Sequence, residues 1–159
     1  MKKPYAFLAA LSALALPVLA HGADRGEAKA TVAGKAVTID YGRPALQGRD
    51  MLAKAEVGQA WRMGADAETT LKTDADLAFG NAAVPKGVYV LTATKVAEGQ
   101  WQLNVRTKEK AKVADVPLEM AKTPASVELL TIDLTGDKGK GTFTMSWGDV
   151  ALKTAFTGK

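Results

Sequence analysis

Hydrophobic and polar residues alternate with a period of two in several short segments of this chain. The clearest examples are residues 37–41, 101–106 and 142–147, where hydrophobic side chains alternate with polar ones. This period is typical of a β-strand that buries one face and exposes the other. Hydrophobic positions with helical spacing are scarce. The pattern therefore predicts about eight to ten short strands separated by turns.

Turn signals between these segments favour antiparallel pairing. In Pro85-Lys86-Gly87 the proline presets φ for the first central position, and the glycine tolerates a positive φ. Glu98-Gly99 and Gly148-Asp149 are predicted to join two further pairs of strands. The predicted fold class is all-β, either an antiparallel β-sandwich or a partly open barrel.

Two segments depart from the alternation. Residues 50–57 are predicted to form a short helix, because Asp50 is a suitable N-cap and Gly58 a suitable end. Residues 108–123 have no clear period and contain Val116-Pro117 and Thr123-Pro124. Because proline opposes both helix and central strand, this segment is predicted to be a long connection.

The N-terminus has the pattern of a secretory signal peptide. Two lysines precede an apolar run from Ala6 to Leu16, and Val18-Leu19-Ala20 provides compact residues before a cleavage point. The run is shorter than the about 20 apolar residues that a spanning helix needs. We expect a signal peptide at 1–20, a flexible lead-in at 21–29 and a single domain at 30–159. The processed protein is expected in the periplasm or outside the cell.

Composition excludes several classes of site. The chain has no cysteine and a single histidine, His21, so it has no disulfide, no cysteine nucleophile, no Ser-His-Asp triad and no multi-histidine metal site. Loss of Lys2 and Lys3 with the signal lowers the formal net charge from +4 to +2, which weakens any indication of nucleic-acid binding. We expect no nucleic-acid partner, no cofactor, no metal and no membrane span after processing.

The segment from Tyr41 to Thr70 is unusually rich in arginine, aromatic residues and glycine. It contains the elements Tyr41-Gly42-Arg43-Pro44, Gly48-Arg49 and Trp61-Arg62-Met63-Gly64-Ala65-Asp66. Together with the turn at 85–89, these elements resemble the domain of unknown function 2911 family of exported bacterial proteins. The resemblance covers nearly all of the chain from about Ala30 and implies a β-rich exported domain, with no established activity. Members of that family often carry asparagine at the position of Asp66.

Five residues of this segment are predicted to bind a ligand: Arg43, Arg49, Trp61, Arg62 and Asp66. Guanidinium groups bind carboxylate or phosphate through two parallel hydrogen bonds, and an indole offers a flat stacking surface. The alternative is structural, because neighbouring acids such as Asp40 and Asp50 could pair with the arginines and hold residues 42–60 against the sheet. The sequence leaves both interpretations open.

These residues favour a non-catalytic exported domain that binds a small anionic or sugar-like ligand, or an envelope protein. An enzyme is the less favoured class: Asp66 and Glu68 would share one face of a strand, which suggests a carboxylate-dependent hydrolase of envelope glycans. A purely structural envelope protein is the third hypothesis. Four further aromatic residues are expected in the core: Trp101, Phe143, Trp147 and Phe156.

Overall fold

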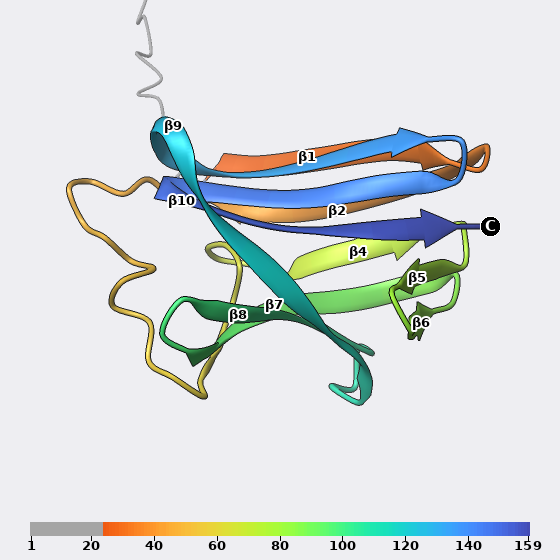
Figure 1. Ribbon diagram of the computed structural model, residues 1–159, viewed down its shortest axis with the longest axis horizontal. Coiled ribbons are helices and arrows are strands. Elements are labelled where there is room, and N and C mark those ends of the chain that lie inside the picture. The colour runs from red at the N-terminus through yellow and green to blue at the C-terminus, as the bar shows by residue number, and fades with distance from the viewer. Residues whose placement is uncertain (1–23) are drawn as a thin grey trace, which may run out of the picture.

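The computed structural model describes residues 24–159, and these residues form ten strands and no helix (Figure 1). The predicted all-β class is confirmed. The predicted signal peptide, residues 21–23 of the predicted lead-in and His21 lie outside the described residues. The strands are β1 (Asp24–Val32), β2 (Lys35–Arg43), β3 (Ala60–Trp61), β4 (Thr69–Thr73), β5 (Leu77–Phe79), β6 (Ala82–Val84), β7 (Gly87–Ala97), β8 (Gln100–Arg106), β9 (Lys112–Asp137) and β10 (Lys140–Gly158).

All of these strands belong to one antiparallel sheet that is not closed into a barrel. The hydrogen-bonded order is β1-β2-β4-β7-β8-β9-β10-β5-β6, and β3 pairs with β7 beside β4. The sheet curls over itself, so that β1 lies against the C-terminal part of β9 (Figure 1). Gly136 permits this approach, because a Cβ at that position would collide with the carbonyl of Thr31. The core lies inside the curl.

Strand β9 joins the two halves of the curled sheet. Its first part, residues 112–118, pairs with β8, and its remainder, from Glu119 to Asp137, pairs with β10. Figure 1 shows the first part crossing diagonally before the strand bends and runs back beside β1. The register with β10 shifts on both sides of Gly148, whose φ of 62° is in the left-handed region. Strands β9 and β10 therefore bend together where the register of their pairing shifts, around Gly148.

Two sequence predictions in this region are wrong. Residues 112–123 are strand, not connection, and Gly148-Asp149 is a bend inside β10, not a hairpin turn. Pro117 is tolerated because β9 there pairs with β8 on one side, before its pairing with β10 begins at Glu119. Pro124 falls between the paired residues Lys122 and Val127, where β9 bulges.

Two further predictions are also wrong. Residues 51–54 form turns and not the helix predicted at 50–57. The carboxylate of Asp50 does accept a hydrogen bond from the Ala53 amide at 3.0 Å, as a helix cap would, but the single turn is not continued. Residues 24–29, assigned to a flexible lead-in, form most of β1, because pairing with β2 satisfies their backbone.

The core is built from the inward-facing positions of the predicted alternating segments. Trp101, Phe143, Trp147 and Phe156 are all buried, with at most 4% of each residue exposed, which confirms their prediction as core aromatics. The rings of Phe156 and Phe79 lie 5.3 Å apart, and this contact packs β10 against β5. Several outward-facing side chains of β7 and β8, such as Thr92, Gln102 and Asn104, are polar instead, and they line the candidate site.

Candidate ligand-binding groove

Arg43 and Arg49, two of the predicted site residues, hydrogen-bond to different segments. Arg43 is half-buried at the end of β2, where its Nε donates to the carbonyl of Leu130 at 3.3 Å and its Nη2 to the Thr131 hydroxyl at 3.2 Å. Arg49 is exposed, and it donates to Leu46 and Gln47 in its own turn. Arg43 therefore links β2 to β9, whereas Arg49 makes only local hydrogen bonds.

Arg62 and Asp66 lie together in one turn before β4. The Nη1 of Arg62 donates to the backbone carbonyl of Asp66 at 2.9 Å, and Asp66 has a φ of 62°. The turn packs directly on the end of β2, because a Cβ at Gly42 would collide with the backbone of Ala65. The glycine in the Tyr41-Gly42-Arg43-Pro44 element thus allows close contact between two backbone segments.

Trp61 faces away from the residues on either side of it. Its ring stacks on that of Trp147, with centroids 5.9 Å apart and an interplanar angle of 9°, and meets Trp101 edge-on at 6.4 Å. Ala60 and Arg62 instead line a hollow on the opposite, outer face of the sheet. Alternation along β3 therefore directs Trp61 to the core tryptophans while its neighbours reach the outer surface.

The hollow beside Ala60 and Arg62, which we term the β7–β8 groove, has a volume of about 500 Å³. Its floor is the outward face of β7 and β8, and its rim is formed by residues before β4 and after β8. Arg62 is the one predicted site residue among those that line it. The groove is lined by Gly58, Ala60, Arg62, Glu68, Val90, Thr92, Thr94, Gln102, Asn104, Arg106 and Lys110.

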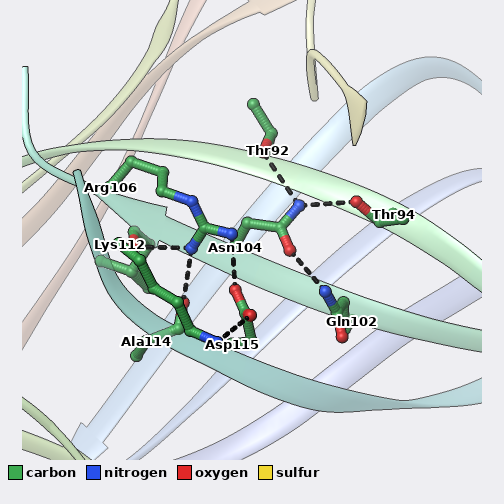
Figure 2. Close-up of polar contacts among 9 residues, drawn as sticks. Thr92, Thr94, Gln102, Asn104, Arg106, Lys112, Ala114 and Asp115 are labelled. Atoms are coloured by element: carbon green, nitrogen blue, oxygen red, sulfur yellow. Dashed lines mark hydrogen bonds and ion pairs between the residues drawn. The ribbon is translucent and has the colours of Figure 1, made fainter. Parts of the chain in front are cut away.

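A connected set of polar side chains forms the groove floor (Figure 2). Asn104 is only 2% exposed, and its Nδ2 donates to the hydroxyls of Thr92 at 3.0 Å and Thr94 at 2.8 Å. Its Oδ1 accepts from the Nε2 of Gln102 at 2.9 Å. Register explains the contacts, because Thr92 pairs across the strands with Asn104 and Thr94 with Gln102. Each polar side chain is thus held in one orientation.

An ion-pair cluster adjoins this floor at Arg106 (Figure 2). The Nη2 of Arg106 lies 2.7 Å from Asp115 Oδ1, and the Nζ of Lys112 lies 2.7 Å from the other carboxylate oxygen. The Nη1 of Arg106 also donates to the carbonyls of Val105 and Ala114. Burial acts to raise the pKa of Asp115, but hydrogen bonds and charges from Lys112 and Arg106 lower it overall. The Arg106 guanidinium is consequently fixed at one end of the groove.

The rim of the groove carries a second ion pair, between Glu68 and Lys110. Lys110 lies in the turn after β8, so this pair connects that turn to the chain before β4. Nearby, Arg25 of β1 pairs with Asp40 and donates to carbonyls at Ala65 and Ala67. Arg25 thus makes structural ion-pair and hydrogen-bond contacts of the kind that the sequence suggested for Arg43, Arg49 and Arg62.

Asp66 and Glu68 do not share a strand face, because both precede β4, which begins at Thr69. The argument for a same-face carboxylate pair is therefore wrong. Within residues 24–159 no group of three or more His, Cys, Asp or Glu residues could hold a metal ion. No helix in the same range is long and apolar enough to span a membrane.

A second hollow, of about 520 Å³, lies where β10 approaches β5. Its polar lining residues, such as Thr135, Asp137 and Lys140, are exposed, and its buried contributors are Phe156 and Gly141. The β7–β8 groove differs because buried polar groups, Thr94 and Asn104, form its floor. Polar groups buried beneath a surface hollow are the more informative sign of specific recognition.

Sequence reasoning missed Asn104, Thr92, Thr94 and Gln102 as site residues. The alternation shows the outward phase of Gln102 and Asn104, but residues 88–94 form a largely apolar segment in which Thr92 and Thr94 do not stand out. Nothing local indicates that the outer face is hollowed by residues 58–68. The one available signal was the run of amide and guanidinium side chains at Gln102, Asn104 and Arg106, because asparagine is depleted in strand interiors.

Comparison with known proteins places the chain in a family. Residues 23–156 match the model of a family described as "Protein of unknown function (DUF2911)". Neither the curated proteins nor the solved structures give a match. Because the matched range covers most of the chain, this protein belongs to the DUF2911 family, whose function is unknown.

Proposed function

We propose that this protein is a non-catalytic binding domain that holds a small polar ligand, anionic or sugar-like, in the β7–β8 groove. The observation that carries the proposal is Asn104, a polar residue 2% exposed at the base of an open hollow. Its hydrogen bonds hold the hydroxyls of Thr92 and Thr94 in fixed positions at the base of the hollow, where a ligand could meet them. The groove volume of about 500 Å³ suits a molecule the size of a monosaccharide or a dicarboxylate.

A thermal-shift screen of residues 21–159 against sugars, phosphates and dicarboxylates tests this proposal. A ligand present at 100 times its Kd should stabilise the fold by about 2.7 kcal/mol, which raises Tm by roughly 5–10 °C for a domain of this size. Arg62→Ala should reduce the shift, since Arg62 lines the groove.

Arg49→Ala is the matched control for Arg62→Ala. Both arginines are exposed and hydrogen-bond to backbone carbonyls in their own turns, but Arg49 does not line the groove. The proposal requires a shift that Arg62→Ala diminishes and Arg49→Ala leaves intact. A panel without any stabilising compound would instead favour the purely structural hypothesis.

The hydrolase hypothesis receives less support from the same region. Glu68 is ion-paired to Lys110, and Asp66 lies in a turn with positive φ. Turnover of a glycan panel that disappears in Asp66→Asn or Glu68→Gln would reverse this preference.

We also propose that the protein is exported, on the basis of the lysines, apolar run and compact residues at 1–20. Expression of the full chain in a bacterium should yield a periplasmic or secreted product that begins at His21. Intact-protein mass spectrometry of the fractions measures this, and an unprocessed chain retained in the cytoplasm would contradict it.

A further inference from the structure

We propose that the β7–β8 groove selects a ligand that bears a carboxylate, such as a sugar acid, over the neutral sugar of the same shape. This inference rests on the proposed function and names the ligand class. It follows from the direction of the hydrogen bonds on the groove floor, which determines whether the floor offers protons or lone pairs to a ligand.

The amide of Asn104 determines that direction. An asparagine side chain has two N–H protons, and both are used, one toward Thr92 at 3.0 Å and one toward Thr94 at 2.8 Å. The Gln102 amide donates to the Asn104 oxygen at 2.9 Å, which fixes the amide in this orientation. The hydroxyl oxygen of each threonine therefore accepts one hydrogen bond from Asn104.

A hydroxyl that accepts from Asn104 still has its own proton to donate. Thr92 and Thr94 both line the groove and stand two residues apart on β7, so their side chains are on one face. The floor consequently offers two O–H donors side by side, which a ligand with two acceptor oxygens can engage together.

The spacing of these donors suits a carboxylate. Because both hydroxyl oxygens bond to the same nitrogen, they lie less than about 6 Å apart. Two oxygens of one carboxylate can each accept one such proton, and hydrogen bonds to an ionised acceptor are the stronger kind. A neutral sugar hydroxyl accepts more weakly and brings a proton of its own.

The charges around the groove also favour an anionic ligand. Its lining includes three cationic side chains, Arg62, Arg106 and Lys110, and one acidic side chain, Glu68. Asp115 balances Arg106 from beyond the lining, and Glu68 balances Lys110. Arg62 shares its turn with Asp66, and Lys112 adds a second cation beside Asp115, so cations exceed acids around the hollow, which favours an anion there.

Glucuronate and glucose provide a matched pair of probes, since they differ only in a carboxylate in place of a hydroxymethyl group. Titration calorimetry of residues 21–159 at low salt should show glucuronate bound at least about tenfold more tightly than glucose. Inorganic phosphate and succinate complete the set, to separate the carboxylate from anionic charge in general and from the sugar ring.

Asn104→Asp reverses the floor with little change in shape. A carboxylate at position 104 accepts the protons of both threonines, so the hydroxyls no longer donate to the ligand, and it adds a negative charge. The preference for glucuronate should fall to about unity or below. Thr92→Val, which removes one donor and keeps the side-chain shape, should weaken glucuronate binding severalfold; it also serves if Asn104→Asp fails to fold, as judged by circular dichroism.

The outcomes separate the two proposals. Equal affinity for glucuronate and glucose, tighter binding of phosphate than of glucuronate, or an unchanged preference in both variants overturns the carboxylate inference and leaves the groove a ligand site. If no probe and no compound of the wider screen binds, the proposed function itself fails, and this inference fails with it.

Discussion

Replacement of Trp61 by alanine tests whether this indole is part of the core or part of a ligand site. In the structure it contacts two tryptophans that belong to distant strands, Trp101 of β8 and Trp147 of β10. It is also one of the two residues by which β3 pairs with β7. Trp61→Ala should therefore destabilise the whole fold and not only a surface loop.

The size of the effect follows from buried area and ring contacts. About 150 Å² of apolar surface, the lower end for a half-buried tryptophan, gives roughly 4 kcal/mol at about 25 cal/mol per Å², an upper estimate because unfolded chains are not fully extended. The centroid distances of the stacked and edge-on ring pairs lie within the range in which each aromatic pair adds about 0.5–1.5 kcal/mol beyond the area term. We expect a net loss of about 3–5 kcal/mol in the free energy of unfolding.

Urea unfolding followed by far-ultraviolet circular dichroism measures this loss. With a slope of about 1–3 kcal/mol per molar urea, the midpoint should fall by more than about 1 M. Trp61→Phe is the control, since it keeps a flat ring on Trp147 and should lose about half as much. A midpoint for Trp61→Ala within about 0.2 M of the parent, together with loss of ligand binding, would refute the core assignment and restore Trp61 to the site.

Two other predictions concern acid stability and a close backbone contact. The pKa of Asp115 is lower in the folded chain than the usual value of about 3.9, so its ionised form stabilises the fold above about pH 4, and this contribution disappears as pH falls through the lower folded pKa. Asp115→Asn should reduce stability at pH 7 and flatten the loss below pH 4 in urea titrations; an acid limb as steep as in the parent would show that other carboxylates dominate. Gly42→Ala should cost about 3 kcal/mol or more, because the new Cβ meets the backbone of Ala65. Gly48→Ala, which meets nothing within 4 Å but has a φ of 72°, should cost only about 1 kcal/mol, and equal losses by urea unfolding would contradict the clash.

Strands with regular alternation were predictable, but the bend that curls the sheet was not. The alternating segments around Ile39, Leu103 and Met145 are all strands with those residues buried. The sequence around Pro117 and Pro124 does not predict β9, because a strand admits proline where it has one free side or a bulge, and neither condition is visible locally. Gly148 was recognised as a special backbone position, but the same positive φ serves a bend as well as a turn.

The candidate site was predictable only where its chemistry was local. Arg62 was singled out by its neighbours and does line the groove, whereas Asn104 looked like an ordinary outward residue of an alternating strand. The hollow above it depends on residues 58–68, which are distant in sequence and contribute part of its lining. Arg43 was recognised as important, but its partners at Leu130 and Thr131 lie on a strand almost ninety positions further along the chain. Pairings at that range do not follow from composition or period.

Because β9 contributes its first quarter to one half of the sheet and the rest to the other, neither half is a separable folding unit. A fragment that ends before residue 112 would leave β8 with an exposed edge. A fragment that begins after residue 118 would lack the strands that enclose its core. We therefore expect the described residues to unfold in a single cooperative transition. Strand β9 accordingly connects the β7–β8 groove to the far side of the molecule through one continuous stretch of backbone.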